Sequence, residues 1–174
     1  MKVLVAVDDS DFSRHALAWV LDHLFPAAAD PPAAEPRPAL VLVLVHALEP
    51  LRHIMYPVGP GSAVYGEPSM MESVRAAQAE NARNLLDRAK RICQQRGVSA
   101  EAVVVEGEPR EALCRAAADM DAGLLVVGSR GLGAIKRAFL GSVSDYCAHH
   151  ASCPIMVVKP PRDDDEHAHH RTTS

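Results

Sequence analysis

Short apolar runs that alternate with helical segments constrain the fold of this chain more than any other feature of its sequence. The five runs are rich in Val, Leu and Ile, and they cover residues 3–7, 40–45, 102–105, 123–127 and 154–159. Because polar and apolar residues do not alternate within them, we expect strands buried on both faces. With the helical segments between them, they predict an α/β fold: a five-stranded parallel sheet with helices on both faces and right-handed crossovers.

Four segments have the periodicity and the boundary residues of helices. They cover residues 10–25, 69–96, 109–120 and 142–150. The second is the longest and stops at Gly97, a residue that commonly follows a helix end. We expect its apolar stripe to consist of Leu85, Ala89, Ile92 and Cys93.

The chain length of 174 residues fits a single domain, which we place at residues 1–161. Residues 27–38 are rich in proline and alanine and predict a surface loop or mobile insertion. Residues 48–68 contain several prolines and glycines and predict a long loop. Residues 162–174 are acidic and then His-rich, and they predict a disordered tail.

The charge balance argues against a nucleic-acid or membrane surface. The net charge is −4, and residues 163–166 alone supply four negative charges, so the rest of the chain is close to neutral. The N-terminal apolar run is too short for a signal peptide, and no run of roughly 18 apolar residues follows. The four cysteines show no C-x-x-C spacing and predict reduced thiols. We therefore expect a cytoplasmic protein that binds neither nucleic acid nor membrane.

A glycine-bearing loop after the fourth run carries the clearest chemical signal. Residues 128–131 read Gly-Ser-Arg-Gly, and nine residues later residues 141–144 read Gly-Ser-Val-Ser and open the last helix. Glycine lets a backbone approach a ligand closely, and the unpaired N–H groups of a helix start attract phosphate. Arg130, Lys136 and Arg137 could add positive charge. Taken alone, however, the glycines could equally be turn residues and Ser142 a helix cap.

The position of this loop favours a nucleotide site. Ligands of parallel sheets bind at the carboxyl ends of the strands, where Asp8, His46 and Gly128 are expected. Two common phosphate motifs do not fit, because no glycine precedes Gly59 and Lys136 stands where a dinucleotide fingerprint needs its third glycine. His46 could be a general base, but no serine or cysteine nucleophile accompanies it, which favours an ordinary strand-end histidine.

The chain resembles the universal stress protein family in its ATP-binding branch. The signature of that branch, G-x2-G-x9-G-[ST], is met by Gly128, Gly131, Gly141 and Ser142. The resemblance extends over nearly the whole chain apart from the proline-rich insertion, parts of the 48–68 loop and the tail. It implies a single Rossmann-like domain of the adenine nucleotide alpha hydrolase type, with ATP or AMP as the ligand.

The resemblance also implies which residues contact the nucleotide. Asp8 should lie against the ribose or adenine, although it could instead cap the first helix. The remaining contacts should come from the backbone of Ala6 and Ala47 at the adenine, from Gly128, Ser129, Arg130 and Gly131 along the ribose and phosphates, and from the N–H groups of Gly141, Ser142, Val143 and Ser144 at the phosphates.

Three functions are compatible with these residues. The first is a non-catalytic regulator in the stress response, in which the nucleotide sets the order of the 132–140 loop and hence the choice of protein partners. The second is a slow ATP hydrolase, in which Asp8 or Asp9 helps to hold Mg²⁺ or Mn²⁺. The third is a chaperone-like interaction protein with a vestigial cleft. No catalytic residue and no metal site of the protein itself is predicted, and Tyr56 and Tyr65 could close over the nucleotide or serve a partner.

The resemblance further implies a homodimer. Members of the family commonly pair their last strands, and residues 155–158 are apolar. Such a strand would otherwise leave an exposed sheet edge, which favours pairing with another chain.

Overall fold

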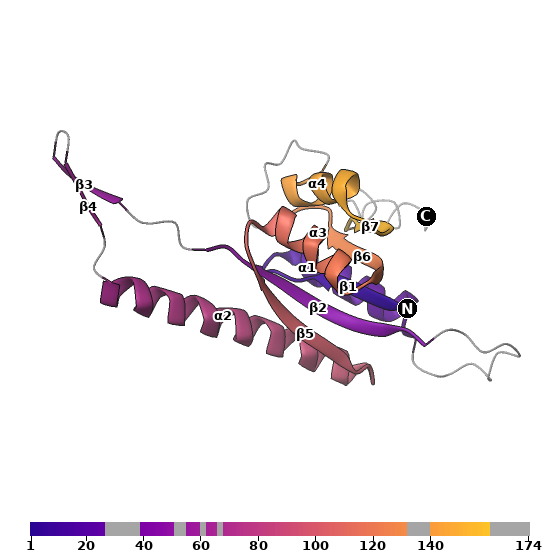
Figure 1. Cartoon of the computed structure of the whole chain (residues 1–174). Helices are drawn as coiled ribbons and strands as arrows, with labels where there is room; N and C mark the ends of the chain where they lie inside the picture. Colours follow the sequence, from indigo (N-terminus) through magenta and orange to yellow (C-terminus); the bar gives the residue numbers. More distant parts are fainter. Residues whose placement is uncertain (27–38, 51–54, 60–61, 66–67, 132–139, 161–174) are drawn as a thin grey trace, which may run out of the picture.

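A five-stranded sheet in which every strand pairs parallel to its neighbours forms the centre of the molecule (Figure 1). The computed structural model describes residues 1–26, 39–50, 55–59, 62–65, 68–131 and 140–160. The strands of the sheet are β1 (Lys2–Ala6), β2 (Val41–Leu48), β5 (Ala100–Glu106), β6 (Ala122–Gly128) and β7 (Ile155–Val158). Their order, β5-β2-β1-β6-β7, confirms the predicted fold class and places the reversal of strand order between β1 and β6.

Four helices cover the two faces of the sheet. They are α1 (Asp11–His23), α2 (Pro68–Gln95), α3 (Pro109–Asp119) and α4 (Ser142–His150). On one face, α1 and α2 pack against Val3, Val5 and Leu44, whereas α3 and α4 pack against Leu4 and Val45 on the other. Consecutive residues of a strand point to opposite faces, so an unbroken apolar run supplies both halves of the core.

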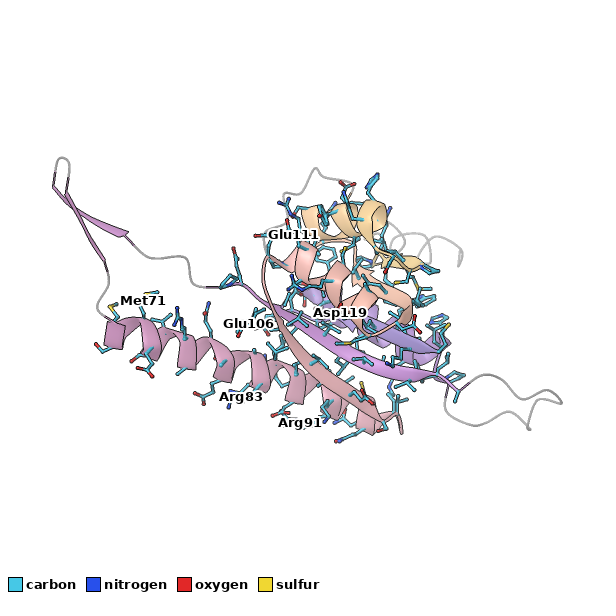
Figure 2. The ribbon with its side chains drawn as sticks, in the orientation of Figure 1. Met71, Arg83, Arg91, Glu106, Glu111 and Asp119 are labelled. Atoms are coloured by element: carbon cyan, nitrogen blue, oxygen red, sulfur yellow. The ribbon has the colours of Figure 1, made fainter. Side chains whose placement is uncertain are left out.

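Helix α2 packs on the sheet only through its second half. Its buried residues follow helical spacing and are Ala82, Leu85, Leu86, Ala89 and Cys93. The prediction that Ile92 belongs to this buried stripe is wrong, because Ile92 is 38% exposed. Helical geometry places it at the edge of the stripe, farther from the centre than Ala89 and Cys93. Figure 2 shows Arg83 and Arg91 pointing away from the sheet. Neither α2 nor any other helix within the described residues combines the length and apolarity needed to cross a membrane.

The segment 48–68 differs from the long loop that its prolines and glycines predict. Strand β2 extends to Leu48, and an antiparallel hairpin follows, made of β3 (Met55–Gly59) and β4 (Ser62–Tyr65). The physical reason is that aromatic and branched residues flank the glycine-rich turn on both sides, which is a hairpin pattern. The predictions for residues 27–38 and for the tail at 162–174 lie outside the described residues.

Candidate functional site

A cavity of about 610 Å³ opens at the carboxyl ends of the central strands. Its walls come from the ends of β1, β2 and β6 and from the first turns of α3 and α4. All of the predicted site residues except Ser129 line it: Ala6, Asp8, Ala47, Gly128, Arg130, Gly131, Gly141, Ser142, Val143 and Ser144. The strand order places these distant segments together, because β1 lies between β2 and β6.

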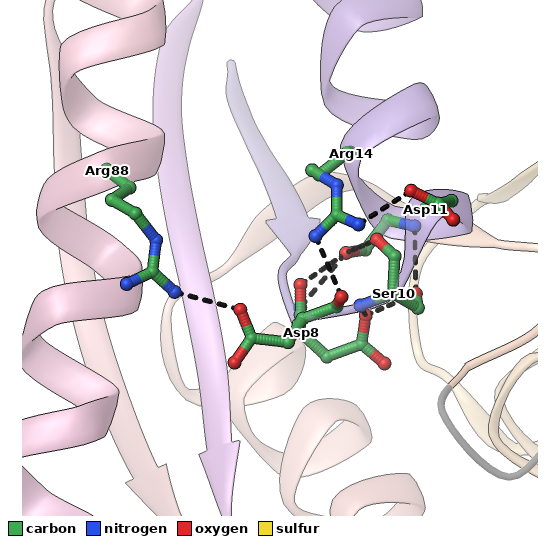
Figure 3. Close-up of polar contacts among 7 residues, drawn as sticks. Asp8, Ser10, Asp11, Arg14 and Arg88 are labelled. Atoms are coloured by element: carbon green, nitrogen blue, oxygen red, sulfur yellow. Dashed lines mark hydrogen bonds and ion pairs between the residues drawn. The ribbon is translucent and has the colours of Figure 1, made fainter.

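Asp8 makes hydrogen bonds within the loop before α1 (Figure 3). It also lines the cavity. Its Oδ1 accepts hydrogen bonds from the backbone N–H of Ser10 at 3.0 Å and from Ser10 Oγ at 2.5 Å. Ser10 Oγ in turn accepts from the N–H of Ser13 at 3.2 Å, so Ser10, and not Asp8, caps α1. The other oxygen, Oδ2, lies 3.0 Å from the point where a Cβ on Gly131 would stand. One carboxylate oxygen thus fixes the loop, and the other faces the glycine loop across the cavity.

Asp9 belongs to the outer side of the same loop. Its Oδ1 lies 2.8 Å from Arg88 Nη2 of α2, and its carbonyl oxygen accepts from Arg14 Nη1 at 2.7 Å (Figure 3). Asp9 does not line the cavity. Its carboxylate is therefore positioned to anchor the loop to α2, which leaves Asp8 as the member of this acidic pair that lines the cavity.

The start of α4 presents backbone donors to the cavity. Gly141 is the N-cap of α4 and has no side chain that could satisfy the following amides. Among the described residues, the N–H groups of Ser142, Val143 and Ser144 have no acceptor, and all three residues line the cavity. Unpaired amides and the positive end of a helix dipole together attract an anion.

Gly141 differs from the other expected phosphate contacts. Its N–H, which was expected to hold phosphate, donates instead to the carbonyl of Ser129 at 2.8 Å. This bond connects the residue before α4 with the residue after β6, so it holds the start of the helix against the end of the strand. Of the four amides predicted to hold phosphate at α4, those of residues 142–144 have no acceptor among the described residues.

Ser129 connects elements behind the cavity. It is 4% exposed, and its N–H donates to the carbonyl of Val158 in β7 at 2.8 Å. Its carbonyl accepts from Gly141 and also from Ser144 Oγ at 3.2 Å. Ser129 therefore fixes the position of the glycine loop and of α4 from outside the ligand space.

The glycines of the motif are also required by close packing. A Cβ on Gly128 would lie 2.8 Å from the backbone carbon of Phe12 in α1, and a Cβ on Gly141 would lie 3.2 Å from Arg130 Cα. The first distance is shorter than any ordinary carbon contact. Gly128 thus allows the end of β6 to pack closely against α1, and Gly141 allows the start of α4 to pack closely against Arg130.

Polar side chains on the cavity wall have defined partners. The guanidinium of Arg130 lies 5.8 Å from the ring centroid of Phe12, a cation–π distance. His46 Nδ1 lies 2.8 Å from the carbonyl oxygen of Val7, so this nitrogen carries the proton and donates it. This bond agrees with the interpretation of His46 as a satisfied strand-end histidine. Lys136 and Arg137, which were expected to add charge, lie outside the described residues.

Sequence reasoning missed several wall residues. Glu49 follows the end of β2, Pro109 and Leu113 stand in the first two turns of α3, and Leu140 precedes α4. These residues belong to no motif, but the wall residues of α3 could have been predicted from the order of strands and helices. The helix that follows β5 begins at the same sheet edge as the glycine loop, so its first turns must border the same space.

A metal centre made by the protein alone finds no support in the part of the chain that the structure describes. Within it, no cluster of three or more His, Cys, Asp or Glu side chains is placed to hold a metal ion.

Comparisons with known proteins agree on one family. A model of the universal stress protein family matches residues 1–159. A universal stress protein A-like protein of Arabidopsis thaliana is 33% identical over 102 residues, and the match covers 59% of this chain and 58% of that protein. The chain therefore spans little more than half the length of this relative. The universal stress protein YxiE of Bacillus subtilis is 30% identical over 158 residues, which cover 91% of this chain and 98% of YxiE.

A solved structure shares the fold over nearly the whole length. It is the crystal structure of a universal stress protein family protein from Arabidopsis thaliana with AMP bound. The two proteins are 25% identical and superpose with a TM-score of 0.63, and the match covers 94% of each chain.

Proposed function

The chain belongs to the universal stress protein family, and on this premise we propose that its cavity binds an adenine nucleotide, ATP or AMP, as the signal of a stress-response regulator. The observation that carries this proposal is that residues 142–144, whose amides have no acceptor among the described residues, line a cavity of nucleotide size. The solved Arabidopsis relative with AMP bound supports the choice of an adenine nucleotide.

The phosphates fit the end of the cavity formed by α4. Amide donors and a helix dipole stabilise negative charge there without a proton transfer, and Arg130 lines the same wall. Asp8 is an unsuitable neighbour for phosphate because both carry negative charge. Its Oδ2 suits the ribose hydroxyls, which are neutral donors.

The adenine fits the part of the wall that is apolar. Val7, Val45, Leu113 and Val127 line this part, and a flat aromatic base gains free energy when it leaves water for such a surface. Ala6 and Ala47 stand at or next to the ends of β1 and β2 and can offer backbone groups to the edge of the base.

Regulation suits this site better than fast turnover. Asp8 and Asp9, the two acids considered for metal-assisted hydrolysis, are engaged in loop contacts to Ser10 and Arg88. A bound nucleotide can act by favouring one arrangement of the glycine loop over another, provided that its affinity differs between the two. Slow hydrolysis with Mg²⁺ or Mn²⁺ held by Asp8 Oδ2 is the second candidate, favoured by the position of this oxygen on the cavity side.

A homodimer through β7 is part of the proposal. β7 is the last strand of the sheet order, so its outer edge has no partner strand in the part of the chain that the structure describes. Three of its residues, Ile155, Met156 and Val157, are only half-buried. Pairing of two copies along this edge would cover both the backbone groups and these side chains. Light scattering after size-exclusion chromatography tests this part, and a monomer at micromolar concentration would contradict it.

The nucleotide proposal is tested on protein purified without added ligand. Heat-released small molecules are identified by mass spectrometry, and AMP and ATP are then titrated into the stripped protein with and without Mg²⁺. We expect an adenine nucleotide in the released fraction and saturable binding of at least one of the two. No binding at millimolar concentration would contradict the proposal. Turnover above the no-protein background would favour the hydrolase.

A further inference from the structure

Three of the four cysteines gather on the face of the sheet that α3 and α4 cover. Cys114 lies in α3, Cys147 lies in α4, and Cys153 precedes β7; all three belong to one apolar cluster. The sulfur atoms of Cys114 and Cys147 are 3.7 Å apart. The remaining cysteine, Cys93, belongs to the core on the opposite face. The close pair therefore joins two helices that are separate in sequence.

The two members of the pair differ in access to solvent. Cys147 is fully buried, with its sulfur 3.8 Å from the carbonyl oxygen of Arg110, whereas Cys114 is partly exposed. Oxidants attack thiolates that they can reach, so Cys114 is the member that an oxidant meets first. Cys147 is the thiol in position to react with it next.

The pair also lies directly behind the candidate nucleotide cavity. Leu113, which lines the cavity, precedes Cys114, and Val143 and Ser144, which line it as well, stand one turn before Cys147. A bond between the two sulfurs would connect the α3 wall to the α4 wall. Neither cysteine lines the cavity itself.

We propose that Cys114 and Cys147 form a reversible disulfide when the protein meets a hydroperoxide, and that this bond lowers the affinity of the cavity for its nucleotide. The second half of this statement rests on the proposed function. Oxidation of Cys114 and Cys147 would thus change the affinity of the nucleotide site through a movement of α3 and α4.

The chemistry balances with hydrogen peroxide as the oxidant. The Cys114 thiolate attacks one peroxide oxygen, the O–O bond breaks, and Cys114 sulfenic acid and hydroxide form. The Cys147 sulfur then attacks the sulfenic sulfur, the S–O bond breaks, and the departing hydroxide takes the thiol proton as water. Two thiols lose two electrons in total and one peroxide gains them. A thiol reductant reverses the change by exchange.

The loss of affinity follows from the movement that the bond requires. The sulfurs must approach from 3.7 Å to the disulfide bond length of about 2.05 Å. Because Cys147 is fully buried and its close-packed neighbours restrict rotation of its side chain, we expect part of this approach to come from a movement of α4 toward α3 or the reverse. The first turn of α4 carries the phosphate-binding amides, and hydrogen bonds weaken as their geometry departs from the optimum. A movement of this turn therefore weakens the hydrogen bonds to phosphate.

The disulfide is tested on the full-length protein. Reduced protein is treated with hydrogen peroxide, free thiols are alkylated, and intact mass and non-reducing peptide maps are recorded. We expect a peptide pair linked through Cys114 and Cys147, an intact mass with two fewer alkyl groups than the reduced control, and reversal by dithiothreitol. Cys114→Ser, at a partly exposed position that should tolerate the change, and Cys147→Ala should both abolish the link. Cys93→Ala and Cys153→Ser should retain it.

Two results would overturn the disulfide. One is oxidation of Cys114 to sulfinic acid with no linked pair, and the other is a dominant link through Cys153. The coupling is tested by titrating AMP into reduced and oxidised protein, with Cys114→Ser as the matched control. We expect oxidation to weaken binding about fivefold or more in the wild type only. Equal affinities would overturn the coupling. A linked pair with no AMP or ATP binding in either state would overturn the proposed function but leave the disulfide standing.

Discussion

The N–H of Gly141 donates to the carbonyl of Ser129 at 2.8 Å, and this bond sets the start of α4 against the end of β6. The bond engages the amide of Gly141. The amides of residues 142–144, which line the cavity, have no acceptor among the described residues. Ser129 is held in turn by its own bond to Val158 of β7. The candidate phosphate site is therefore built on the rigid sheet, which fixes the donors before any ligand arrives.

Replacing Gly128 tests the packing role of the motif. Gly128→Ala places a Cβ 2.8 Å from the backbone of Phe12, where neither atom can turn aside. We expect the free energy of unfolding to fall by about 1–3 kcal/mol, as for other overpacked sites. Urea denaturation measures the change. A variant as stable as the wild type would show that α1 and β6 can separate without cost.

Replacing Gly131 should affect the ligand more than the fold. Its new Cβ would lie 3.0 Å from Asp8 Oδ2, the end of a side chain that can rotate. We expect Gly131→Ala to cost less stability than Gly128→Ala but to weaken nucleotide binding about threefold to tenfold, because the carboxylate turns away from the ribose. Calorimetric titration with AMP measures the affinity. If the two variants lost stability equally and Gly131→Ala bound AMP normally, Asp8 would have no part in recognition.

Much of the fold could be predicted from the sequence because both faces of the sheet are covered. The covered part of a strand, such as residues 3–6 of β1, must then be apolar at every position, and that pattern is easy to detect. The hairpin at β3 and β4 was missed, since its prolines and glycines indicate loops more strongly than its aromatic residues indicate strands. The order of the strands depends on which strands pair in the folded protein. The sequence therefore did not predict that the strand order reverses between β1 and β6.

The candidate site could be predicted only in part. The site residues predicted from the glycine motif stand in two short segments, 128–131 and 141–144, and all of them except Ser129 line the cavity. Leu113 and Pro109 come from a different element and became visible only when α3 was placed. The bond from Gly141 to Ser129 could not be foreseen, because it depends on how the chain returns after eleven intervening residues.

Thiol reactivity should follow burial. Burial, with smaller contributions from the neighbouring Cys114 and Cys153, raises the pKa of Cys147 to about 12, and burial also raises the pKa of Cys93. A raised thiol pKa means that the reactive thiolate is scarce below that pH and gains population only as the pH rises. At about pH 8, we expect iodoacetamide to modify Cys114 well before Cys147 or Cys93. Time-resolved peptide mass spectrometry measures the order, and equal rates for Cys114 and Cys147 would contradict the described packing.

The central claim is that backbone amides at the start of α4 hold the phosphates, and the substitution Ser142→Pro tests one such amide alone. Ser142 is the first residue of α4, a position that accepts proline, and Gly141 before it has φ −74° and ψ 159°, which a following proline requires. The variant should therefore keep the helix while it loses one N–H donor. Ser142→Ala is the matched control, because it removes the hydroxyl and keeps the amide.

The decisive measurement is the dissociation constant for the released nucleotide, by calorimetry, in the wild type and both variants, with circular dichroism to verify the fold. Ser142→Pro should bind about tenfold to a hundredfold more weakly, the cost of a hydrogen bond to a charged group. Ser142→Ala should remain within about threefold of the wild type, since neutral surface changes cost little. Equal binding by a folded Ser142→Pro variant would contradict the account.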